Sequence, residues 1–98
     1  MASSFKNRQF LIESRKADAA RGDADALYDL GICYQTGTAG AAIDLIEAHK
    51  WFNLAATRGF LAAQDARAEV AGDMTAREIA SAQAAARAWI GSTRAGHA

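Results

Sequence analysis

The stretch GDADALYDLGICYQTGTAGAAIDLIEAHKWFNLAATRG, from Gly22 to Gly59, decides the fold of this chain. An Arg-Gly pair stands at each end of it, and a glycine that follows a helix commonly takes the left-handed conformation that ends the helix. Between these ends, helical periodicity is interrupted once, by the glycine-containing segment 36–43. The stretch therefore predicts a helix-turn-helix unit.

The residues after Gly59 begin a second, shortened copy of this unit. Ala86 and Trp89 follow Ala48 and Trp51 by 38 positions, and self-similarity at a fixed spacing is the signature of helical repeat proteins. The chain is also 51% hydrophobic and has no proline, which favours closely packed helices. We expect an all-α fold, an α-α superhelix, formed as a short solenoid of antiparallel helix hairpins with about five helices.

We expect the 98 residues to form a single domain. Its predicted parts are an N-terminal capping helix, a full repeat, a truncated second repeat and a flexible tail. These parts span residues 5–21, 22–58, 59–90 and 91–98.

Local signals predict the helix starts and one close helix contact. Asp23 and Asp44 are good N-caps for the helices that follow them, and Thr75-Ala76-Arg77-Glu78 is a capping box for the last helix. Gly31 is expected to let another helix approach closely. The predicted buried stripes are Ala26, Leu27, Leu30, Cys33 and Tyr34; Leu45, Ala48, Trp51, Phe52, Ala55 and Ala56; and Ile79, Ala82, Ala86, Trp89 and Ile90.

These positions resemble the Sel-1-like repeat, a relative of the tetratricopeptide repeat. The match is nearly complete over one repeat, whereas the second copy has lost the Leu-Gly-x-x-Tyr segment. The matching residues are Gly22, Ala26, Leu30, Gly31, Tyr34, Gly37, Gly40, Asp44, Ala48, Trp51, Phe52, Ala55, Ala56 and Gly59. The resemblance implies a superhelical scaffold that binds partner proteins on the concave side, which the first helix of each pair lines.

The charge and composition of the chain indicate which classes of partner and which cellular compartment to expect. The formal net charge is zero and no run of like charges is present, so a nucleic-acid partner or a membrane partner is not expected. The N-terminal residues lack the apolar run of a signal peptide, and no window approaches a membrane span, which predicts a cytoplasmic protein. The single cysteine, Cys33, is interpreted as small core filler.

Catalytic chemistry has little support in the sequence. His49 is expected on the solvated flank of its helix, and His97 lies in the predicted tail. Neither has a ligand partner at helical spacing, so no metal site, no cofactor and no enzymatic activity is expected.

The remaining candidate site is the open arc of the helix predicted at 24–35. It offers aromatic and apolar contact together with hydrogen-bond acceptors, which suits an extended peptide or a basic partner helix. The alternative is that this arc packs internally against a neighbouring helix. The predicted partner-binding residues are Asp25, Tyr28, Asp29, Ile32 and Gln35.

A protein-protein interaction module, an adaptor or scaffold, is the preferred function. One alternative, which the resemblance implies, is a small hydrolase or ligand-binding enzyme of the β-lactam-related type, because some secreted, cysteine-rich Sel-1-like proteins are linked to binding or cleaving β-lactam-like compounds. The other alternative is a homo-oligomeric structural unit. Self-association is expected because Ile46 and Leu54 lie outside the predicted buried stripe and, with Ile32, would leave apolar surface.

Overall fold

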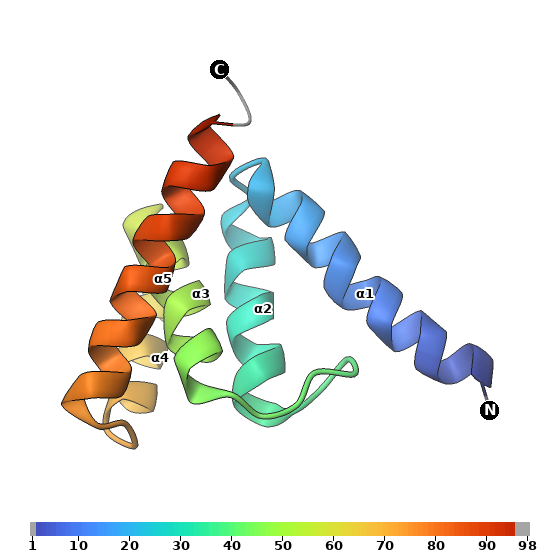
Figure 1. Cartoon of the computed structure of the whole chain (residues 1–98), viewed down its shortest axis with the longest axis horizontal. Coiled ribbons are helices and arrows are strands. Elements are labelled where there is room, and N and C mark those ends of the chain that lie inside the picture. The colour runs from blue at the N-terminus through green and yellow to red at the C-terminus, as the bar shows by residue number, and fades with distance from the viewer. Residues whose placement is uncertain (1, 96–98) are drawn as a thin grey trace.

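The computed structural model describes residues 2–95, with side-chain environments from residue 11 to residue 94, and this part of the chain forms five α-helices. They are α1 (Ala2–Ala20), α2 (Ala24–Thr36), α3 (Leu45–Thr57), α4 (Leu61–Ala71) and α5 (Ala76–Ala95). Consecutive helices run in opposite directions, so α1, α3 and α5 all end at the upper side of the molecule in Figure 1. The prediction of an all-α fold is confirmed.

Two predicted boundaries are wrong at the ends of the chain. The first helix begins at Ala2 rather than at residue 5, and α5 continues through residues 91–95, which were predicted to be a flexible tail. The hydroxyl of Thr93 donates to the carbonyl oxygens of Trp89 (3.0 Å) and Ile90 (3.1 Å), and Thr93 lies on the same helical face as Trp89. Both hydrogen bonds lie within α5 and span Gly91, so the helical backbone continues past this glycine. The rest of the predicted tail, including His97, lies outside the described residues.

The predicted N-caps are confirmed. Oδ1 of Asp23 accepts hydrogen bonds from the backbone N–H groups of Asp25 (3.0 Å) and Ala26 (3.3 Å). Oδ1 of Asp44 accepts one from Glu47 N–H (3.1 Å). Each bond satisfies an amide that has no partner within its own helix, so the starts of α2 and α3 are set locally.

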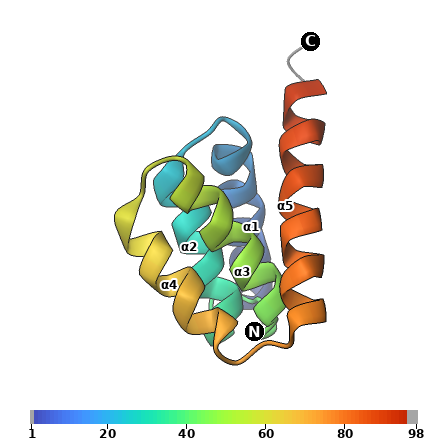
Figure 2. The same ribbon diagram turned by 90° about the vertical axis from the view of Figure 1, so that its left-hand side faces the viewer.

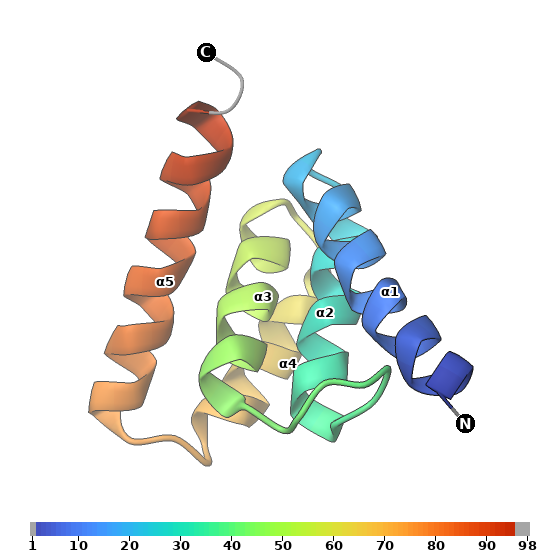
Figure 3. The ribbon, with the colours of Figure 1, turned by 45° about the vertical axis from the view of Figure 1, so that its right-hand side comes forward.

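Helix α3 is the centre of the fold. It packs against α2, α4 and α5, while α1 packs against α2. Figure 3 shows α2 and α3 between α1 on one side and α5 on the other, and Figure 2 shows α4 and α5 on different sides of α3. Although α4 and α5 are consecutive, α5 packs mainly on α3. The side chains of Trp51 and Phe52 are almost completely buried in this arrangement.

Leu54 does not lie on the open surface that was predicted for it. It is only 4% exposed, because α5 covers this side of α3. Ile32 and Ile46 are half-buried. The three residues therefore leave less apolar surface than the sequence indicated, which weakens that argument for self-association.

No helix within residues 2–95 combines the length and the apolar character needed to cross a membrane.

Candidate functional site

The residues of the predicted partner-binding arc of α2 differ in their exposure to solvent. Asp25 and Asp29 are exposed and stand about one helical turn apart. Tyr28, Ile32 and Gln35 are half-buried. Both carboxylates therefore reach the surface, and helical spacing places Asp25 and Asp29 on the same side of Tyr28 around the axis of α2.

Tyr28 joins α2 to the start of α4. Its ring stacks on Phe60, with the ring centroids 4.8 Å apart and an interplanar angle of 29°, and it meets Phe52 at 5.5 Å. Such pairs add specific geometry to the burial of apolar area. The tyrosine is therefore held in one orientation, with part of its surface still exposed.

Ile32 packs with the cluster of Ala48, Phe52 and Val70, so its main contact is internal. Asp29 forms an ion pair with Arg15 of α1 (Oδ2 to Nε, 3.4 Å) in which both side chains remain well exposed. An exposed pair of this kind contributes little stability, which leaves the Asp29 carboxylate available to a partner.

His49 lies in the interface between α3 and α4, which corrects the prediction of a solvated histidine. It is 3% exposed, and its Nδ1 has no hydrogen-bond partner among the described residues. Burial lowers the pKa of His49 below 6.5, and the positive charge of Arg67 lowers this pKa further. Arg67 itself donates to Oδ1 of Asn53 at 2.7 Å. The sequence misplaced His49 because it does not show on which flank of α3 helix α4 packs.

Residues 11–94 bring no group of three or more histidine, cysteine or carboxylate side chains into position for a metal ion.

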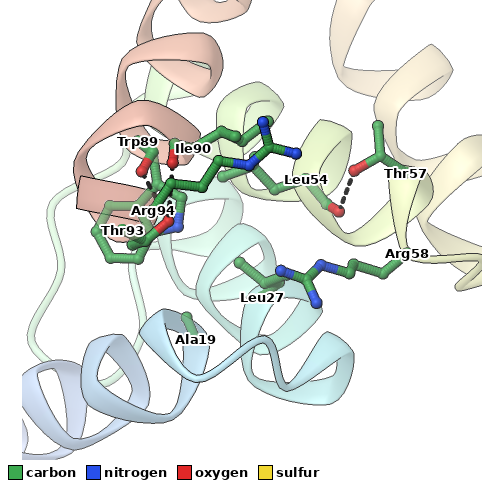
Figure 4. A pocket seen from close by; sticks show the side chains of 9 residues that line it. All are labelled: Ala19, Leu27, Leu54, Thr57, Arg58, Trp89, Ile90, Thr93 and Arg94. Atoms are coloured by element: carbon green, nitrogen blue, oxygen red, sulfur yellow. Dashed lines mark hydrogen bonds between the residues drawn. The ribbon is translucent and has the colours of Figure 1, made fainter. Parts of the chain in front are cut away.

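A cleft of about 240 Å³ opens where the ends of α1, α3 and α5 meet the start of α2 (Figure 4). Its apolar lining residues are Ala19, Leu27 and Leu54, which are almost completely buried, and Trp89 and Ile90, which are partly exposed. Its polar rim consists of Thr57, Arg58, Thr93 and Arg94. The cleft therefore combines apolar contact area with two positive charges.

The side-chain hydrogen-bond donors that remain in this cleft are its guanidinium groups and the indole N–H of Trp89. Thr57 donates its hydroxyl hydrogen to the Leu54 carbonyl at 2.7 Å, and the Thr93 hydroxyl is likewise directed to carbonyls of its own helix. No carboxylate within the described side chains forms an ion pair with Arg58 or Arg94. In Figure 4 the two arginine side chains extend from opposite sides toward the middle of the cleft.

The turn between α1 and α2 positions Arg58. Gly22 has a φ of +90°, and a Cβ atom there would overlap the guanidinium of Arg58. Nη1 of Arg58 lies 3.5 Å from the Gly22 carbonyl oxygen, a long and weak hydrogen bond. A glycine at this turn is what lets Arg58 lie across it, beside the cleft.

Sequence reasoning missed this cleft, although a signal for it was present. Thr-Arg occurs twice at a helix end, as Thr57-Arg58 and Thr93-Arg94, after the two equivalent tryptophans. Because the two helices run in the same direction, these dipeptides reach the same end of the molecule.

Comparison of the chain with protein-family models, with curated proteins and with solved structures found no match. The resemblance to the Sel-1-like repeat therefore stays a prediction from the sequence.

Proposed function

We propose that this chain is a non-enzymatic protein-protein interaction module, an adaptor or scaffold, that binds a basic peptide or helix of a partner protein. The binding surface is the outer face of α2, with Asp25 and Asp29 as acceptors and Tyr28 as the apolar centre. The observation that carries this proposal is the pair of exposed carboxylates one helical turn apart on α2, together with the partly exposed ring of Tyr28 that Phe60 and Phe52 hold in place.

A ring held in this way loses little conformational entropy when a partner covers it. Rigid aromatic side chains commonly contribute much of the binding energy of an interface, and charges around them steer the encounter and set specificity. With two exposed carboxylates on the same helix as the ring, a partner segment that carries lysine or arginine is electrostatically complementary. Gln35 lies two helical turns after Tyr28 and adds a further polar side chain to this face of α2.

We also propose that the five helices are a short α-α superhelix, with α2 and α3 as the full repeat and α4 and α5 as a modified one. The packing of α3 against α2, α4 and α5 supports this, because the second helix of a stacked repeat contacts its own partner and the following pair.

The test is a selection of peptides from a random displayed library against the whole chain. We expect the enriched peptides to carry a net positive charge and to shift the amide resonances of α2 around Tyr28. The double variant Asp25→Asn/Asp29→Asn should weaken their binding about two- to fivefold for each charge removed, as expected for exposed ion pairs.

Asp73→Asn is the matched control, because Asp73 is also an exposed carboxylate but lies in the turn between α4 and α5. It should leave the affinity unchanged. Peptides that are enriched without positive charge, or resonance shifts confined to other helices, would contradict the proposed surface.

A further inference from the structure

We propose that the cleft between Arg58 and Arg94 is a binding site for a small organic carboxylate whose acid group is joined to an apolar or aromatic body. This site goes beyond the protein-binding face of α2, which attracts the opposite charge. The two arginines bind the carboxylate, and the partly exposed side chains of Trp89 and Ile90 pack against the rest of the ligand.

The shape and lining of the cleft fix this class of ligand. A volume of about 240 Å³ is below the usual range for a drug-sized molecule and suits one ring with a short acidic tail. The indole of Trp89 and the side chain of Ile90, which is 37% exposed, offer the apolar surface against which such a ring packs. Two guanidinium groups line the cleft, and each presents paired N–H donors of the kind that bind carboxylates.

The attraction between the arginines and an anion is weak here, so the ligand needs an apolar body as well as its carboxylate. Arg58 and Arg94 are exposed, so water and salt screen their attraction for an anion. The ends of α1, α3 and α5 also turn their carbonyl groups to this side, which gives it a negative dipole component. A bare anion such as phosphate therefore gains little here, whereas a carboxylate with an apolar body also gains from burial of its ring.

The experiment titrates the full chain with 3-phenylpropionate and follows the Trp89 indole N–H and the backbone amides of Arg58 and Thr93 by NMR. We expect these resonances to shift together and saturate, and binding to weaken as salt is added. Arg58→Gln and Arg94→Gln should each weaken binding about tenfold, because each removes a charge-assisted hydrogen bond.

Three controls separate the site from a general effect of charge. The neutral 3-phenylpropanamide and inorganic phosphate should each bind much more weakly than the acid. Arg87→Gln removes another exposed arginine of α5 that does not line the cleft and should leave the affinity unchanged. If Arg58→Gln disturbs the α1–α2 turn, Arg94→Gln alone carries the test.

Equal binding of the acid and its amide, equal weakening by Arg87→Gln, or the absence of saturable shifts at Trp89 overturns the proposal. Equal weakening by Arg87→Gln, or the absence of saturable shifts, would mean that Arg58 and Arg94 only offset the negative dipole ends of the helices.

Discussion

At Gly31 the backbone of α2 lies directly against the aromatic ring of Phe52 on α3. A Cβ atom at this position would overlap the ring, and Phe52 is fully buried, so the ring has no room to move aside. The close approach of the two central helices therefore depends on a single missing side chain. The same ring also meets Tyr28, so the spacing of α2 and α3 affects the proposed protein-binding face.

Gly31→Ala should destabilise the protein by about 1–3 kcal/mol, the usual cost of overpacking a dense core. Chemical denaturation measures the change. Gly91→Ala is the matched control, because Gly91 is an exposed helical glycine with open space around its Cβ position. That control should gain about 0.5–1 kcal/mol from helix propensity. A neutral or stabilising effect at Gly31 would show that the two helices separate without cost.

The buried His49 predicts a pH dependence of stability. Its pKa is lowered in the folded state, so the unfolded chain binds the proton more readily. The free energy of unfolding is therefore at its full value above about pH 6.5 and falls as the pH drops below 6.5 toward the lowered pKa, with a slope of at most about 1.4 kcal/mol per pH unit.

Denaturation of the wild type and of His49→Leu between pH 7.5 and pH 5, a range chosen around the ordinary histidine pKa of about 6.5, measures this slope. The variant should lack the part of the slope that His49 causes, while the carboxylates contribute equally to both proteins. Parallel profiles for the two proteins would mean that His49 is protonated without disturbing the α3–α4 interface.

At the scale of the element, the starts of α2, α3 and α5 are set by side chains within four positions of each start. Thr75 and Glu78 satisfy each other's backbone amides at the start of α5, with distances of 2.8 and 3.1 Å. Helix α4 is the exception. Phe60 occupies its N-cap without a side-chain hydrogen bond, and its ring stacks on Tyr28 instead. Contact with α2 takes the place of a cap there.

Thr75→Ala should lower stability by about 1 kcal/mol, because it leaves the amide of Glu78 without its partner. Amide hydrogen exchange should become faster in the first turn of α5 and stay unchanged in α2. Thr75→Ser keeps the hydroxyl group and should behave like the wild type. Unchanged exchange in Thr75→Ala would place the start of the helix elsewhere.

At the scale of the whole molecule, α5 is attached to the rest of the fold through α3. Ala82 and Ala86 are buried, and the rings of Trp89 and Trp51 meet edge to face with centroids 4.7 Å apart. Nζ of Lys50 lies 4.2 Å from the centroid of the Trp51 ring. Because α4 contributes little to holding α5, this contact with α3 determines whether the last helix stays docked.

Trp89→Ala should destabilise the protein by about 2–3 kcal/mol, less than for a fully buried tryptophan because Trp89 is partly exposed. Hydrogen exchange should accelerate along α5 before it does in α2. Arg87→Ala, on the exposed side of the same helix, is the control. Equal protection of α5 in both variants would show that α5 is held by other contacts.

The sequence by itself determined the local features of this protein. The capping residues Asp23, Asp44 and Thr75 predicted where three helices start, and Gly31 predicted the close contact between two helices. These features depend on hydrogen bonds and steric limits that act within a few residues or at one backbone position, so they can be read from the chain. The all-α fold follows from the same signals.

Only the tertiary structure decided which neighbour covers each flank of a helix. His49 and Leu54 lie outside the stripe predicted for their helix, yet both are buried, because α4 and α5 pack on different sides of α3. The Arg58/Arg94 cleft likewise joins residues 36 positions apart in sequence at one end of the molecule. Helical periodicity shows that a helix has a buried side, but the directions from which other helices approach depend on the packing of the whole chain.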